Sequence, residues 1–208
     1  MYFSQIPRGF AETSISKFLC NYELIKKLGL PTLNTVERCV LGGCEGVMCD
    51  NVNYSNGKIY VTYNSLYSDS QKLLYMLSKD ILGNREERKT SLAEEFRYRN
   101  KIEEIINFEE FVISAKSDLI LATKQDILIE FDSYFFGSQK YSSITEIDYK
   151  IVDLDHIFTD TNKTEEELLD LNFSEFMRAL GGFLKYFVSG NNQIKYLEYL
   201  DRSRTTFE

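Results

Sequence analysis

Apolar residues recur at helical spacing in three well-defined segments. Between Ser14 and Leu28 they lie on one stripe, which Gly29 ends. A wider stripe runs from Asn172 to Phe187, and a third amphipathic segment is centred on Ile194, Leu197 and Leu200. We expect a helix in each segment, with Asn172 capping the start of the second.

Other segments show the alternation and turn residues of β-structure. Residues 36–53 combine small and β-branched residues, which predicts short strands and turns. The Asn56-Gly57 pair lies between β-rich flanks over 53–63 and predicts a tight hairpin turn, because both residues tolerate positive φ. Apolar and polar residues alternate over 146–151, which is typical of a strand with one polar face.

Capping patterns add further helices. Ser68 with Gln71 predicts a helix running to Leu82, and Ser91 with Glu94 predicts one through Ile106. Thr164 with Glu167 predicts a short acidic helix. Residues 108–136 have mixed periodicity, so one long helix and a helix followed by a strand are both open.

Together these patterns predict an α+β fold that is dominated by helices. We expect a small antiparallel β-region at about 36–63 and short strands near 144–152. The only prolines are Pro7 and Pro31, which fits a helix-rich chain. We expect a single domain over 1–208, with the charged run at 84–90 as the best candidate for a boundary.

Charge is distributed unevenly along the chain. Of the net −8, a balance of −7 falls between Ile144 and Asn172, where nine acids face two lysines. Direct contact of this segment with nucleic-acid phosphates is therefore disfavoured, and a solvated acidic face is the simple interpretation. The sequence has no 18-residue apolar run and begins without a signal-peptide pattern, which predicts no membrane span and a cytoplasmic location.

One motif suggests chemistry. The segment Tyr134-Phe135-Phe136-Gly137-Ser138 is followed by Glu146-Ile147-Asp148, and this resembles the signature of the minimal nucleotidyltransferase family. The resemblance implies that Gly137 and Ser138 form a turn against a triphosphate, and that Glu146 and Asp148 bind Mg²⁺ from one face of a strand. The same region also fits a helix that ends at Gly137 in a left-handed cap.

Two further groups of residues were considered as ligands. The spacing of Cys20, Cys39, Cys44 and Cys49 does not form two close pairs, so we expect reduced, buried thiols rather than zinc ligands. His156 follows Asp153 and Asp155, which could orient it as a base, but no nucleophile is marked elsewhere. A surface or capping role for the histidine is the expectation.

Because no complete active site emerges, the leading hypothesis is a non-catalytic assembly subunit that needs no cofactor. Its composition and its lack of an active site fit a viral (phage virion) or mobile-element origin, with assembly in the cytoplasm. We expect it to bind other protein subunits through its C-terminal helices (172–201), where Tyr186, Tyr196 and Tyr199 lie off the main apolar stripe. The Gly181-Gly182 pair would let another backbone approach. The alternative is a metal-dependent nucleotidyltransferase-like enzyme using Mg²⁺.

Overall fold

The computed structural model describes residues 2–5, 11–41, 44–49, 56–61 and 97–204. This part of the chain is an α+β protein with four helices and small, mainly antiparallel sheets. The helices are α1 (Ala11–Lys27), α4 (Phe108–Lys124), α5 (Glu165–Phe187) and α6 (Gly190–Arg204). The strands are β1 (Tyr2–Gln5), β2 (Val36–Leu41), β3 (Cys44–Cys49), β4 (Lys58–Val61), β5 (Glu104–Ile105), β6 (Leu128–Ile129), β7 (Tyr134–Gln139), β8 (Ile144–Thr145), β9 (Ile147–Ile151) and β10 (Ile157–Phe158).

Two three-stranded sheets form the β-structure around which the helices pack. One has the order β1-β3-β2 and the other β4-β7-β9, and all their pairings are antiparallel. The expected strands near 144–152 are confirmed as β8 and β9. The predicted β-region at 36–63 is divided, because β2 and β3 belong to the first sheet while β4 joins the second.

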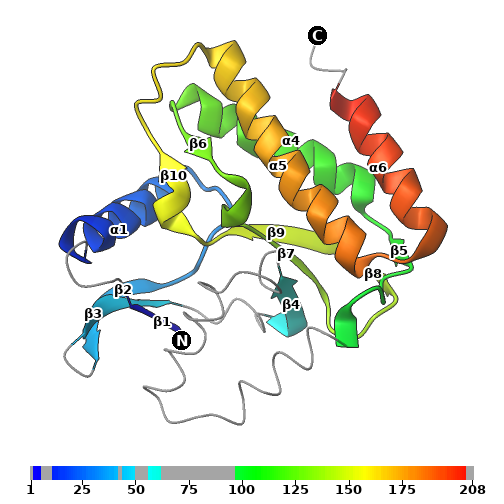
Figure 1. Cartoon of the computed structure of the whole chain (residues 1–208), viewed down its shortest axis with the longest axis horizontal. Helices are drawn as coiled ribbons and strands as arrows, with labels where there is room; N and C mark the ends of the chain where they lie inside the picture. The colour runs from blue at the N-terminus through cyan, green and yellow to red at the C-terminus, as the bar shows by residue number, and fades with distance from the viewer. Residues whose placement is uncertain (1, 6–10, 42–43, 50–55, 62–96, 205–208) are drawn as a thin grey trace.

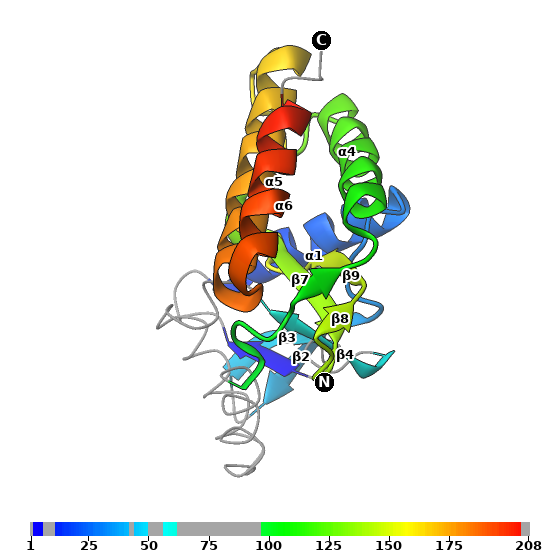
Figure 2. The ribbon, with the colours of Figure 1, turned by 90° about the vertical axis from the view of Figure 1, so that its right-hand side faces the viewer.

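Helices α4, α5 and α6 lie side by side above the sheet formed by β7 and β9, while α1 lies apart from them (Figures 1 and 2). The contact between these layers is aromatic. Phe176 of α5 lies 5.3 to 6.1 Å, ring centre to ring centre, from Tyr134, Phe136, Tyr149 and Phe111. Such tilted and edge-on pairs add to the gain from burying the rings, so this cluster fixes β7 and β9 against the helices.

Helix α5 begins where the sequence predicts but is longer than predicted. The Thr164 side chain accepts a hydrogen bond from the Glu167 backbone amide, and the Glu167 carboxylate accepts one from the Thr164 backbone amide, which forms the predicted capping box. The helix then continues through Asn172, so the prediction that Asn172 starts a separate helix is wrong. Its fully buried side chain instead binds the backbones of Ile127 and Ile129, outside α5.

The segments around α4 and before β4 were also predicted from the sequence, and the structure describes each of them in part. Residues 108–136 form a helix followed by strands, which settles the choice left open above. The helix expected through Ile106 is wrong over its described end, where Ile102 bridges to Val188 and β5 follows. Asn56 and Gly57 both have positive φ, as expected, although residues 50–55 lie outside the description. The predicted helix at 68–82 and the boundary at 84–90 also lie outside the described residues.

Candidate functional site

Two short 3-10 turns face each other at one end of the β7–β9 pair. The turn η3 (Phe131–Ser133) leads into β7, and η4 (Leu154–His156) follows β9. Their backbones are tied together, since the Glu130 amide donates to the His156 carbonyl at 3.2 Å and the Val152 amide donates to the Ser133 carbonyl at 3.0 Å. The sheet therefore holds the side chains of both turns at fixed positions.

Helix α1 donates side-chain hydrogen bonds to the backbone of η4 and of the residue that follows it. The buried Asn21 amide donates to the carbonyls of Leu154 at 2.6 Å and Ile157 at 3.2 Å. One turn earlier in α1, the Lys17 ammonium donates to the Asp155 carbonyl at 2.7 Å. Because buried carbonyls need donors, these contacts orient the turn without using its acidic side chains.

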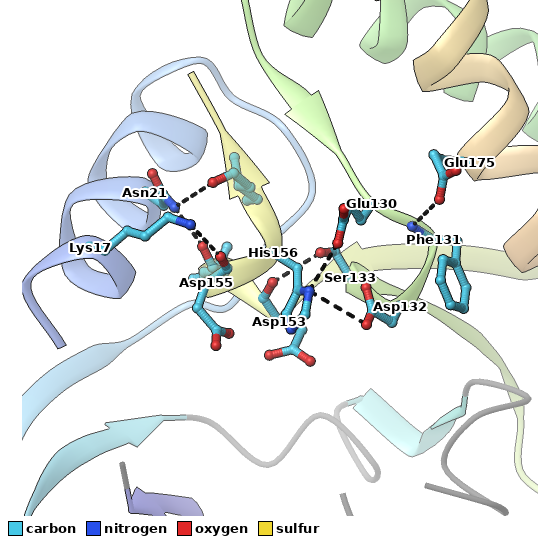
Figure 3. Close-up of polar contacts among 12 residues, drawn as sticks. Lys17, Asn21, Glu130, Phe131, Asp132, Ser133, Asp153, Asp155, His156 and Glu175 are labelled. Atoms are coloured by element: carbon cyan, nitrogen blue, oxygen red, sulfur yellow. Dashed lines mark hydrogen bonds and ion pairs between the residues drawn. The ribbon is translucent and has the colours of Figure 1, made fainter. Parts of the chain in front are cut away.

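Five ionisable side chains of the two turns gather in what is called here the acidic cluster: Glu130, Asp132, Asp153, Asp155 and His156 (Figure 3). His156 Nδ1 lies 3.0 Å from a Glu130 carboxylate oxygen and 3.6 Å from Asp132 Oδ2. The other Asp132 oxygen, Oδ1, is buried and has no hydrogen-bond partner among the described residues. One imidazole therefore serves several carboxylates.

Burial and crowding change the proton affinity of this cluster. Burial raises the pKa of Asp132 and, with the nearby Asp155 carboxyl, raises that of Asp153 well above its ordinary value. The pKa of His156 is also raised, because the surrounding carboxylates outweigh the opposing effect of burial. The cluster therefore holds protons more tightly than the same groups would in water.

A divalent cation is the other species that could neutralise this charge. One ligand atom each from Glu130, Asp132 and His156 can be chosen within 4.8 Å of one another, and the same holds for Asp153, Asp155 and His156. Imidazole nitrogen with carboxylate oxygens is a donor set that suits manganese, zinc or iron better than magnesium or calcium. The buried, unpartnered oxygen of Asp132 fits such a ligand role.

The residues of the nucleotidyltransferase-like motif have other neighbours. Gly137 and Ser138 lie inside β7, paired with Asp148 and Ile147 of β9, and do not form a turn. The Ser138 hydroxyl is fully buried and donates to the Tyr98 hydroxyl at 2.5 Å. The structure thus gives this segment no exposed phosphate-binding turn, and the expectation of a Gly-Ser turn at these residues is wrong.

The two predicted metal ligands are separated by their partners. Glu146 is exposed just before β9, whereas Asp148 Oδ2 accepts hydrogen bonds from Lys58 at 2.8 Å and from the Tyr60 hydroxyl at 3.1 Å. Burial, followed by the nearby Asp148 carboxylate, raises the pKa of Tyr60, so this hydroxyl stays a donor. Neither Glu146 nor Asp148 belongs to a metal-competent group among the described residues.

Gly137 has a packing reason to be glycine. A Cβ built at this position would lie 2.4 Å from both Asp148 Oδ1 and the Tyr60 ring, which is closer than atoms can pack. The glycine therefore lets Asp148 and Tyr60 cross β7 on one face of the sheet. The same residue that suggested a phosphate turn serves a carboxylate–tyrosine contact within the fold.

The three cysteine side chains that the structure describes do not belong to the acidic cluster. Cys20 is on α1, Cys39 on β2 and Cys49 on β3, and the metal-competent groups of the described residues contain no cysteine. Cys20 is exposed, so the expectation of a buried thiol is wrong for this residue. Burial raises the pKa of the Cys39 thiol, with a smaller effect from Glu37. That none of the four binds metal stays a prediction.

Three members of the acidic cluster, Asp153, Asp155 and His156, were recognised from the sequence, whereas Glu130 and Asp132 were not. A signal was present, because Glu130-x-Asp132 and Asp153-x-Asp155 are acid-x-acid pairs that flank the strands β7 and β9. Antiparallel pairing of these strands brings both flanks to one end. The pairing itself could not be predicted while residues 127–136 were undecided between helix and strand.

Of the three tyrosines expected off the main apolar stripe of the C-terminal helices, Tyr186 and Tyr199 are half-buried, whereas Tyr196 is buried. Tyr196 is 4% exposed, and its hydroxyl accepts from the Ile105 amide at 2.7 Å and donates to the Ile105 carbonyl at 3.2 Å. Tyr199 packs edge-on against Phe108 at 5.8 Å. Gly181 faces Leu197 of α6, so the helix that approaches α5 at this glycine belongs to the same chain and not to a partner. The exposed apolar part of α6 is aliphatic.

Comparisons of the chain with protein-family models, with curated proteins and with solved structures gave no match. Among the described helices, none is both long and apolar enough to cross a membrane.

Proposed function

We propose that this chain is a non-catalytic subunit that binds another protein through the outer face of its C-terminal helix α6. The supporting observation is the exposure of Ile194 (56%) and Leu197 (37%), which lie about one turn apart on that helix. Both are large aliphatic residues, and the exposed residues next to them on α6, Lys195 and Glu198, are charged. Contiguous apolar residues at a surface are typical of protein contact sites.

The inner face of α6 explains why the outer face can serve as a rigid contact surface. Tyr196 and Leu200 are buried, and Lys116 of α4 donates to the Ser203 carbonyl at 3.0 Å. Leu197 lies at the border between the two faces, since it is 37% exposed and its side chain is also the nearest one to Gly181 of α5. A partner would therefore meet a helix that is already ordered, which lowers the entropic cost of binding.

The proposal predicts a difference between the protein in its source and the purified chain. In an extract of its natural host the chain should elute in a complex larger than the purified chain. Ile194→Asp combined with Leu197→Asp should return it to the size of the purified chain, because a charge in an apolar interface costs affinity. Size-exclusion chromatography with light scattering measures both sizes.

The matched control alters charged neighbours on the same helix. Lys195→Ser with Glu198→Ser should leave the complex intact, since both side chains are exposed and lie outside the apolar pair. Circular dichroism of the purified variants establishes that α6 is retained. An unchanged elution of the wild-type chain in extract and after purification would overturn the proposal.

A second candidate function, binding of a divalent transition-metal ion at the acidic cluster, is favoured by the buried and unpartnered Asp132 Oδ1. Glu130 and His156 complete the donor set described above. Such an ion would replace protons held by the cluster, so binding should strengthen as pH rises.

Calorimetric titration with Mn²⁺ or Zn²⁺ near neutral pH tests this candidate. Asp132→Asn should weaken binding at least about tenfold, the loss expected for a metal ligand. Asp148→Asn is the matched control: Asp148 Oδ1 is also buried without a partner, but Oδ2 accepts from Lys58 and Tyr60, and Asp148 belongs to no metal-competent group of the described residues. Absence of wild-type binding, or an equal loss in both variants, would remove the metal function and leave the role of α6 unaffected.

A further inference from the structure

Helix α4 carries isoleucines on the face that points away from the core. Ile113 and Ile120 are 59% and 36% exposed, and Ile106, just before the helix, is 59% exposed. Ile113 and Ile120 are seven residues apart within the helix, so they lie on one stripe of α4. The buried residues of α4, among them Phe111, Ala115 and Leu119, lie on the opposite side.

This stripe is not explained by the needs of the helix itself. Isoleucine has a lower helix propensity than the unbranched residues that usually cover an exposed helix face. In Figure 2, α4 lies at one side of the helical layer, with α5 and α6 together on its other side. The stripe is therefore available to a partner that approaches from outside this layer.

The charges of α4 are arranged symmetrically about the middle of this face. The centre of the face lies between Lys116 and Ser117. Ile113 is three residues before Lys116, and Ile120 is three residues after Ser117. Glu109 is seven residues before Lys116, and Lys124 is seven residues after Ser117. Glu109 and Lys124 are exposed, and no ion pair joins either of them to another described residue.

We propose that α4 pairs with α4 of a second copy of this chain in an antiparallel arrangement around a twofold axis. Such an axis between Lys116 and Ser117 places Ile113 of each copy against Ile120 of the other. It also places Glu109 of each copy opposite Lys124 of the other. The surface is therefore self-complementary, because apolar side chains meet apolar ones and opposite charges face each other. The antiparallel helix dipoles add to the attraction.

The size of the contact limits its strength. Helix α4 has 17 residues and is about 25 Å long, so two such faces bury less than a standard stable interface. We therefore expect a concentration-dependent dimer with a dissociation constant of about 10 μM to 1 mM. This inference concerns a different helix from the proposed function and does not depend on it.

Sedimentation equilibrium of the purified full-length chain, across about two decades of concentration around that range, tests the inference. The wild type should pass from monomer to dimer, and Ile113→Asp should weaken the association at least about tenfold. Ile144→Asp is the matched control, since Ile144 is exposed to a similar extent (54%) but lies on β8, outside α4 and α6. It should leave the dissociation constant unchanged.

Charge exchange tests the antiparallel register directly. Glu109→Lys alone and Lys124→Glu alone should each weaken the dimer, because each places like charges opposite one another. The double exchange should restore it, and raised salt should weaken the wild type. Thermal unfolding establishes that each variant is folded. A wild type that stays monomeric, a dimer insensitive to Ile113→Asp, or an equal loss with Ile144→Asp would overturn the inference.

Discussion

The pair formed by β7 and β9 has acidic residues at two places, and the fold neutralises them differently. Toward the turn between the strands, Asp148 accepts hydrogen bonds from the Lys58 ammonium and the Tyr60 hydroxyl. At the opposite end, the acidic cluster has four carboxylates and one histidine as its ionisable members. The Lys17 ammonium that reaches this end donates to the Asp155 backbone carbonyl. One place is a neutralised structural contact, and the other retains unbalanced charge.

The difference shows that an acid-x-acid pattern does not identify a site by itself. Glu146-x-Asp148, Glu130-x-Asp132 and Asp153-x-Asp155 are equivalent in spacing. What separates them is the set of side chains that packing brings alongside, such as Lys58 from β4, which is far from Asp148 in sequence. Unbalanced, partly buried charge is a better indication of a functional region than spacing is.

The largest effect should come from filling the close contact at Asp148. Gly137→Ala places a Cβ 2.4 Å from Asp148 Oδ1 and from the Tyr60 ring, so the salt-bridged carboxylate and the ring must both move. Overpacking of this kind costs about 3 kcal/mol of unfolding free energy. Urea denaturation monitored by circular dichroism measures the change.

The control is a glycine with room for a side chain. At Gly181 an added Cβ would meet only Leu197 at 3.9 Å, an ordinary contact, and the residue is inside α5. Gly181→Ala should therefore be neutral or stabilise by up to about 1 kcal/mol. Equal stability of Gly137→Ala and wild type would mean that Asp148 and Tyr60 are not held against β7 as described.

Local signals in the sequence predicted most elements of the described fold. The Thr164 capping box, the positive φ values of Asn56 and Gly57, and the alternation over 147–151 are each set by neighbouring residues. The same local reasoning failed at Asn172, because its buried side chain bonds to the segment after α4 instead of starting a helix. Tertiary contacts decided that position.

The candidate site was less predictable for the same reason. Asp153, Asp155 and His156 are close in sequence, and they were noticed, but Glu130 and Asp132 join them only through the β7–β9 and β6–β10 pairings. Tyr196 shows the opposite error. It was expected at the surface, yet its hydroxyl satisfies both backbone groups of Ile105 in the core. Local periodicity does not predict which distant segments pair with one another.

A smaller effect should distinguish the two acidic places through pH. In the folded chain the pKa values of Asp132, Asp153 and His156 are all raised, so each group binds its proton more tightly than in the unfolded chain. Their contribution to stability is therefore present at low pH. This contribution is lost as pH rises through the pKa values of the folded chain. The loss begins above the ordinary pKa, which is about 3.8 for the two aspartates and about 6.5 for the histidine.

Asp153→Asn tests whether the acidic cluster is the source of this pH dependence. The amide keeps the shape of the protonated carboxyl but cannot ionise, so the variant should lose less stability than wild type between about pH 5 and about pH 8.5. Urea denaturation at each pH measures the unfolding free energy. Asp170→Asn, at an exposed acid of α5, is the matched control and should keep the wild-type slope. Parallel slopes in Asp153→Asn and wild type would show that Asp153 ionises as freely in the folded chain as in the unfolded chain, and its contrast with the neutralised Asp148 would then have no energetic basis.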